Sequence, residues 1–408
     1  MDMLKRVLKI FRKFGRKLRT KNRIHVVPYR GYGNERMIFQ RGRVLEDKQV
    51  GSSRVADSIW KNIHNAWKRF ESDEIPGAKV RASIDGASRE TVTDSEGYFE
   101  FSLDLEVPFP PEKLWHDVRI ELLEPSHPEQ EPVQIGQVLI PPKSARFGVI
   151  SDMDDTVLQT HATNLLRMFK NIVLGNARTR LPFKGVAAFY QALHEENGQP
   201  TNPLYYVSSS PWNLYDLLME FFTLHHIPVG PLVLRDWGVS RTAIPYRHRN
   251  HKIEAIRHIM DIVDNLPFIL IGDSGQEDPE IYHEILSLYP KRILAIYIRN
   301  VSRDLKRPAA IRELAKKVID AGSTLILTDD TLAAARHAIE QGWISPDRFP
   351  EIVAEKIADD QATPIATKVL KTEEAPTVKV EAPENKKSDI DHGMIEKQLK
   401  EKPVEKTK

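Results

Sequence analysis

Three short segments of the chain hold residue types that could bind and cleave a phosphate ester. Residues 151–156 (Ser-Asp-Met-Asp-Asp-Thr) and 272–278 (Gly-Asp-Ser-Gly-Gln-Glu-Asp) supply carboxylates, residues 208–211 (Ser-Ser-Ser-Pro) supply hydroxyl groups, and Lys252 supplies a cation. A phosphate monoester and a carboxylate nucleophile are both negative, and a divalent cation that bridges them removes the repulsion. Mg²⁺ prefers hard oxygen ligands, so these aspartates are candidate metal ligands.

The elements around these segments place them at one edge of a sheet. Continuous apolar runs occupy residues 147–150, 204–207, 232–234, 268–271, 293–298 and 325–327. Helical patterns lie between them, clearest at residues 212–226, 251–264, 278–288 and 329–341. Such runs are typical of parallel strands buried on both faces, and their alternation with helices predicts a doubly wound α/β domain. Chemistry in such sheets sits beyond the carboxyl ends of the strands, where all three segments begin.

Each motif alone has an ordinary structural explanation. An Asp-rich segment often caps a helix, and serine after a strand is common turn chemistry. A single lysine such as Lys252 usually lies on a solvated surface. The specific signal is the conjunction of all four motifs, in order and on the expected elements.

That order, Asp-x-Asp-x-Thr, then Ser, then Lys, then Gly-Asp-x-x-x-x-Asp, resembles the four motifs of the haloacid dehalogenase superfamily, whose phosphatases depend on Mg²⁺. The resemblance implies that Asp152 is the nucleophile, forming an aspartyl-phosphate, and that Asp154 is the general acid and then the general base. Ser208 would donate a hydrogen bond to the phosphoryl oxygens, and Lys252 would offset charge. The full expected set is catalytic Asp152, Asp154, Ser208 and Lys252, substrate-binding Thr156 and Ser209, and metal-binding Asp152, Asp154, Asp273 and Asp278.

A closer resemblance is to the actin-patch-associated phosphatidate phosphatase family and its bacterial relatives. It is carried by residues 151–156, 206–213, 234–238 and 272–282, with weaker upstream similarity at 28–33 and 42–45, and it spans about residues 25–345. It implies Mg²⁺-dependent dephosphorylation of phosphatidate to diacylglycerol.

The spacing of the motifs also bears on the substrate. Only about 45 residues separate Thr156 from the next strand, too few for a large cap domain, so the sequence predicts an open site that suits a lipid headgroup or a macromolecule. A soluble phosphatase of phosphoproteins or small phosphomonoesters and a non-catalytic membrane adaptor are the alternatives.

Residues 25–145 carry a different pattern. Strict alternation at residues 80–84, 99–105 and 118–122, with a turn signal at 94–97, predicts a small antiparallel β-sandwich with one helical insertion at 53–70. We find no recognisable chemistry in this region. The catalytic domain is expected at residues 146–350.

The net charge of +2 hides an asymmetry. Residues 1–24 carry ten Lys and Arg against Asp2 alone, and their apolar residues recur at helical spacing. This pattern favours a basic amphipathic helix on an anionic membrane. A helix docked on the protein, a nucleic-acid arm and a targeting peptide are the alternatives, and we expect no nucleic-acid partner. The zero cysteines exclude disulfides and cysteine nucleophiles, and fit a reducing compartment. Together with the basic segment, this predicts a cytoplasmic, peripherally membrane-associated protein.

The C-terminal end has yet another composition. Residues 351–408 lack aromatic residues and become rich in Lys, Glu, Pro, Ala and Thr, so they cannot bury enough apolar area to offset the entropy of ordering. We therefore expect a disordered tail.

Overall fold

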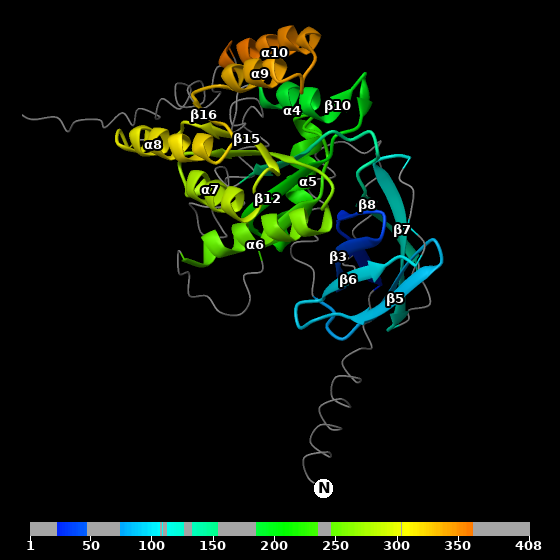
Figure 1. Ribbon diagram of the computed structural model, residues 1–408. Coiled ribbons are helices and arrows are strands. Elements are labelled where there is room, and N and C mark those ends of the chain that lie inside the picture. The colour runs from blue at the N-terminus through cyan, green and yellow to red at the C-terminus, as the bar shows by residue number, and fades with distance from the viewer. Residues whose placement is uncertain are drawn as a thin grey trace, which may run out of the picture. The chain divides into compact units, whose positions relative to one another are not determined.

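The computed structural model describes residues 23–46, 74–106, 108, 112–125, 133–153, 185–235, 246–302 and 304–361 (Figure 1). The predicted helix at 53–70 and residues 362–408 of the predicted tail lie outside the described residues. So does the predicted basic helix apart from its last two residues, of which Ile24 already begins the first strand. Among the described residues, none of the helices combines the length and the apolar character needed to cross a membrane.

The second half of the described chain is an α/β domain, confirmed as a parallel sheet interleaved with helices. Its sheet has six strands in the order β13-β12-β9-β14-β15-β16, all pairs parallel. The strands are β9 (Gly148–Asp152), β12 (Leu204–Pro211), β13 (Leu232–Arg235), β14 (Phe268–Asp273), β15 (Ile293–Arg299) and β16 (Leu325–Thr328). The helices are α4 (Val186–His194), α5 (Tyr215–Leu224), α6 (Tyr246–Ile262), α7 (Asp278–Leu288), α8 (Arg307–Asp320), α9 (Thr331–Glu340) and α10 (Phe349–Gln361), with the short 3-10 helices η3 (Trp212–Leu214) and η4 (Pro346–Arg348) and the two-stranded ribbon β10 (Glu195–Glu196) and β11 (Gln199–Pro200).

Helices cover both faces of this sheet, which explains why its strands are continuous apolar runs. One core packs α4, α5, α9 and α10 against one face, and a second core packs α6, α7 and α8 against the other. Strands β9, β12 and β14 are buried at almost every position. The chain runs outward from β9 to β13 and then returns to β14 on the other side of β9, so β9 and β14 flank a topological switch point.

Two boundaries predicted from the sequence are wrong. Helix α6 begins at Tyr246 rather than at 251, because the four residues after Tyr246 are polar and add no apolar periodicity. The tail does not begin at 351, since α10 continues to Gln361. Helix α10 is held by the fully buried Ile352 and by the Glu355 carboxylate, which accepts a hydrogen bond from the Ala188 backbone nitrogen (2.7 Å). Two anchoring residues do not change the overall composition of the segment, so composition alone does not reveal this helix.

The first half is a β domain, here residues 24–139. Its strands are β1 (Ile24–Pro28), β2 (Gly31–Gly33), β3 (Met37–Glu46), β4 (Lys79–Ile84), β5 (Ala87–Val92), β6 (Tyr98–Asp104), β7 (Trp115–Glu124) and β8 (Val133–Leu139). They form one eight-stranded sheet in the order β1-β3-β2-β8-β7-β4-β5, with β6 paired to β3. The predicted antiparallel pairing is confirmed for every strand pair except β2 with β8, which run parallel. The stacking of a sandwich stays a prediction, because strand pairing does not show how a sheet folds over its core. Alternation within a strand shows which face is buried, but it does not tell whether two strands share one hydrogen-bonded sheet.

The β domain and the α/β domain share buried contacts. Tyr29 and Tyr98 of the β domain belong to the same apolar core as α4 and α5. Tyr32 and Leu139 belong to the core that contains α6. A third core, made of residues of the β domain alone, fills its interior.

Candidate active site

The switch point of the sheet brings two of the three predicted segments together. Strand β14 pairs with β9 in parallel, with Ile271 opposite Ser151, so the two strands end side by side. Asp152 is the last residue of β9 and Asp273 the last residue of β14. Because the carboxyl ends of parallel strands share one edge, both side chains meet where such sheets bind ligands.

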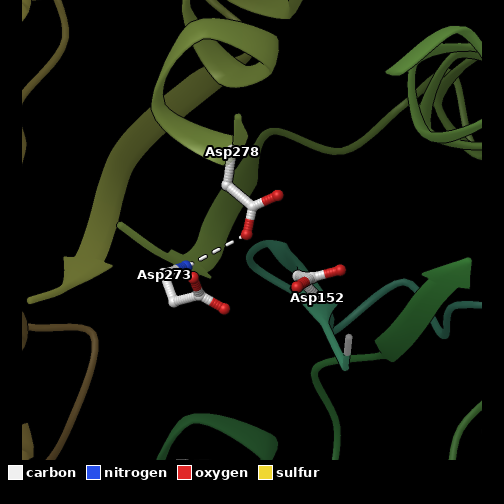
Figure 2. Close-up of side chains that lie close together, drawn as sticks. All are labelled: Asp152, Asp273 and Asp278. Atoms are coloured by element: carbon white, nitrogen blue, oxygen red, sulfur yellow. Dashed lines mark hydrogen bonds between the residues drawn. The ribbon is translucent and has the colours of Figure 1, made fainter. Parts of the chain in front are cut away.

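Asp278 joins these two residues from the first position of α7 and completes what we call the carboxylate cluster: Asp152, Asp273 and Asp278. One carboxylate oxygen from each lies within 4.8 Å of the others (Figure 2). All three residues are buried, Asp278 completely. Asp278 Oδ2 accepts a hydrogen bond from the Asp273 backbone nitrogen (3.0 Å), and Asp273 Oδ1 accepts one from the Gly275 nitrogen (2.6 Å).

Lys252 of α6 reaches this cluster, as the sequence predicts for the charge-offsetting lysine. Its Nζ lies 2.7 Å from Asp152 Oδ1 and 2.9 Å from Asp278 Oδ1, and its side chain is 3% exposed. Nζ also lies 3.4 Å from the Gln276 side-chain oxygen. With all four groups ionised, the three carboxylates and this ammonium leave two negative charges in excess. Buried charge is costly unless it is compensated, and a divalent cation would compensate this excess.

Gly272 allows the close approach of Asp278 to β14. A Cβ at Gly272 would lie 2.5 Å from Asp278 Oδ2 and 2.9 Å from the Tyr282 ring, too close for either contact. The glycine of the Gly-Asp pair therefore has a steric role, because any side chain would push the carboxylate away from its hydrogen bond to the Asp273 nitrogen.

The serines of the second segment lie next to the end of β9. Strand β12 pairs with β9 so that Val207 is opposite Asp152, and Ser208 and Ser209 follow, both completely buried. The Ser208 hydroxyl accepts a hydrogen bond from the Ser210 backbone nitrogen (3.1 Å). Asp154 and Thr156 lie outside the described residues, so their predicted roles remain predictions.

Several residues that support the site were not found from the sequence. Tyr190 of α4 places its hydroxyl 2.7 Å from the hydroxyl of Ser151, directly before Asp152. Arg307 of α8 donates to the backbone oxygens of Ser274 (3.2 Å) and Gln276 (2.6 Å) and so holds the turn after Asp273. A tyrosine in a helix and an arginine at a helix start carry no local signal for such contacts, which depend on tertiary packing.

Two buried tyrosines beside the site stay protonated. Burial, with a smaller contribution from the charge of Asp152, raises the pKa of Tyr190 far above its ordinary value. Burial followed by the charge of Asp278 raises the pKa of Tyr282, whose hydroxyl donates to the Ile271 carbonyl oxygen (2.8 Å). Both phenols are therefore neutral hydrogen-bonding groups near the carboxylate cluster.

Comparison with known proteins finds a family model that matches the part of the chain containing this site. Residues 147–300 match the family model described as the catalytic domain of phosphatidate phosphatase APP1. The phosphatidate phosphatase APP1 of Saccharomyces cerevisiae is 30% identical over 263 residues, which cover 64% of this chain and 42% of the yeast protein. An uncharacterised protein of Schizosaccharomyces pombe is 32% identical over 163 residues, covering 39% of this chain and 26% of that protein. The chain thus matches less than half the length of either relative.

A carbohydrate acetylesterase from Xanthomonas citri aligns over 73% of this chain and 66% of its own at 11% identity, with a TM-score of 0.26. A score of that size carries no argument about fold or function.

Proposed function

We propose that the protein is a phosphatase that converts phosphatidate to diacylglycerol and phosphate, on the premise that residues 147–300 match the family model of the APP1 catalytic domain. The observation that carries the proposal is the buried contact between Lys252 and the carboxylate cluster at the switch point of the sheet. The parallel sheet order and the motifs at its strand ends support a haloacid dehalogenase-like fold for the same domain.

We further propose that Mg²⁺ is the cofactor. The candidate donors are carboxylate oxygens, the ligand type that Mg²⁺ prefers, and the local excess of negative charge fits a divalent cation. Asp152 and Asp273 are the carboxylates proposed to bind it. Both oxygens of Asp278 already contact Lys252 and the Asp273 nitrogen, so its principal role is to orient the other groups. The bound cation would neutralise charge on the phosphoryl oxygens.

The proposed reaction has two steps in which this chain's own residues act. An oxygen of Asp152 attacks phosphorus, the bond from phosphorus to the glycerol oxygen breaks, and Asp154 gives that oxygen its proton. Water then attacks the aspartyl-phosphate, Asp154 takes its proton, and the bond from phosphorus to Asp152 breaks. Lys252, within 2.7 Å of Asp152, holds the nucleophile in place. Ser208 and Ser209 would donate hydrogen bonds to the phosphoryl oxygens.

We propose that the reaction takes place at an anionic membrane on the cytoplasmic side. The basic segment at residues 1–24 supports this, with its ten cations and helical apolar spacing. A lipid phosphate on such a surface reaches an open site without leaving the bilayer.

The test is phosphate release with and without Mg²⁺ from phosphatidate in anionic vesicles and, in parallel, from the soluble ester p-nitrophenyl phosphate. We expect Mg²⁺-dependent release from phosphatidate, and a loss of about a thousandfold or more in Asp152→Asn. Asp304→Asn, which changes an exposed aspartate outside the carboxylate cluster, is the matched control and should keep wild-type activity.

Other results would redirect the proposal. Activity in Asp152→Asn equal to that of the wild type would remove the assigned nucleophile. Faster turnover of the soluble ester, unchanged in a chain of residues 25–408, would favour a soluble phosphatase. Absence of metal-dependent turnover of either ester would favour a non-catalytic adaptor.

A further inference from the structure

The three serines after Val207 lie at an irregularity within strand β12. Its pairing with β13 is regular at Val207, becomes irregular over the next residues and resumes at Pro211. We call residues 208–211, the last four residues of β12, the serine segment. Serine side chains offer the backbone local hydrogen bonds that compete with strand pairing, as between the Ser208 hydroxyl and the Ser210 nitrogen. An irregular segment of this kind needs a fixed point at each end to keep one conformation.

The β domain supplies the far fixed point through Trp212, the residue directly after the serine segment. The Trp212 ring stacks on Tyr29 with 5.0 Å between the ring centroids and 10° between the planes. The Arg41 guanidinium also lies over the Trp212 ring, 4.7 Å from the ring centroid. Trp212 and Tyr29 are buried, at 6% and 5% exposure. A desolvated aromatic and cationic stack of this kind is worth more than the same contacts in water.

A second group of β-domain residues holds Asn213. The Asn213 Oδ1 accepts hydrogen bonds from Arg43 Nη1 (3.2 Å) and from the Tyr98 hydroxyl (2.9 Å). Arg43 is itself fixed, since its Nε donates to the Glu96 carbonyl oxygen and its Nη2 pairs with Glu74, both at 2.9 Å. One donor to Asn213 therefore comes from a buried arginine that cannot readily reorient, and the other comes from the buried Tyr98.

The β domain also holds the helix that carries Lys252. The Tyr32 hydroxyl lies 2.6 Å from Nδ1 of His258, and the Asn34 side-chain nitrogen donates to the Ile262 carbonyl oxygen at the end of α6 (2.7 Å). Because an α-helix is stiff, contacts at its carboxyl-terminal half also limit how far Lys252 can move along the helix axis.

We propose that Tyr29, Arg43 and Tyr98 of the β domain are positioning residues for the reaction, acting through Trp212 and Asn213 on Ser208. This inference rests on the proposed phosphatase function, in which Ser208 contacts the phosphoryl group. It gives the β domain a role that its sequence does not disclose. A displacement of about 1 Å at a group that contacts the reacting phosphoryl can cost up to a hundredfold in rate.

Asn213 offers the sharpest test, because two substitutions of similar size separate its acceptor from its bulk. Asn213→Leu removes the acceptor, and we expect kcat to fall about tenfold with KM within about twofold of the wild type. Asn213→Asp keeps an acceptor for Arg43 and Tyr98 and should restore kcat to within about threefold. Tyr289→Phe is the matched control. Tyr289 lies just beyond the end of α7, at the opposite end of that helix from Asp278. The substitution removes the hydrogen bond from the tyrosine hydroxyl to Asp261 and should leave kcat unchanged.

Hydrogen exchange provides a measurement that does not require activity. We expect amides of residues 208–214 to exchange at least about fivefold faster in Asn213→Leu than in the wild type, and those of β14 to be unchanged. Unchanged exchange at residues 208–214 would overturn the inference. If the wild type is active, a kcat of Asn213→Leu equal to that of the wild type would also overturn it. A wild type inactive on every phosphate ester would refute the proposed function, whereas the exchange rates would still decide whether the β domain holds the serine segment.

Discussion

The two halves of the candidate site are held in different ways. The groups of the carboxylate cluster and Lys252 hold one another by direct contacts inside the α/β domain, with each Asp278 oxygen paired to a group of the same site. The serine segment interrupts the pairing of β12 with β13 and is followed at once by residues bound to the β domain. One half of the site is therefore held mainly by contacts among its own groups, and the other through residues bound to a neighbouring domain.

This difference explains why the β domain carries no recognisable chemistry of its own. Charged groups that must stay within 3 Å of one another need short, direct contacts, which Lys252 provides from α6. A serine hydroxyl that only donates a hydrogen bond can be placed indirectly, by fixing the backbone four or five residues further on. The two kinds of support should fail differently when they are mutated.

The largest effect should come from Lys252→Met. It leaves the buried carboxylates of Asp152 and Asp278 without the ammonium that contacts both. We expect a loss of about 3–5 kcal/mol in the free energy of unfolding, measured by urea denaturation, and an increase in melting temperature with Mg²⁺ that exceeds that of the wild type. A stability equal to the wild type would mean that this cluster does not depend on its internal contacts.

Asp273→Asn should affect activity more than stability. The amide can still accept the hydrogen bond from the Gly275 nitrogen, so the turn survives, but one proposed metal-binding carboxylate is lost. We expect kcat/KM to fall about a hundredfold or more and the Mg²⁺ concentration for half-maximal activity to rise. An unchanged Mg²⁺ requirement would remove Asp273 from the proposed ligands.

Gly272→Ala tests the steric requirement within the carboxylate cluster. The added methyl group would meet Asp278 Oδ2 at 2.5 Å, so we expect kcat to fall about tenfold as that carboxylate moves. Gly148→Ala is the matched control, since its methyl group would meet the Phe268 ring at 2.5 Å at the opposite end of the neighbouring strand. Both should destabilise the protein by about 1–3 kcal/mol, measured by thermal unfolding. Equal specific activities for the two variants would contradict a special role for Gly272.

The smallest effect concerns pH and the helix α5, which follows the serine segment. Burial is the main cause that lowers the pKa of His225, at the end of α5, to about 4. The unfolded value is about 6.5, so the unfolded chain binds the proton more tightly and this contribution to stability is complete above pH 6.5 and decreases as the pH falls toward 4. We expect a loss of about 1–2 kcal/mol between pH 7.5 and 5 from this group.

His225→Gln removes that proton-binding site and should flatten the pH dependence of the melting temperature over the same interval. The histidine ring lies against Phe221 with 4.3 Å between centroids, so the variant will lose some packing at every pH. The informative quantity is therefore the change with pH and not the stability at one pH. An equally steep decline in the variant would assign the acid sensitivity to other groups.

The sequence predicted the α/β domain well, because its signals are local. Runs such as residues 268–271 are buried on both faces, and all six predicted strands appear within a few residues of their observed bounds. Helix α7 was predicted at residues 278–288 and is found there. The β domain was harder, since alternation at residues 80–84 identifies β4 but not the strands it pairs with. Its shortest strands, such as β2, have too few residues to show a period.

Sequence alone also determined which side chains could do chemistry, because their types and order are written along the chain and parallel strands align their carboxyl ends. It could not decide that Lys252 contacts Asp152 and Asp278 at once, that Gly272 makes room for a carboxylate, or that Arg43 and Tyr98 hold Asn213. Those contacts join residues 6 to 170 positions apart. They exist only after helices and strands have packed, since packing fixes which distant side chains share a buried environment.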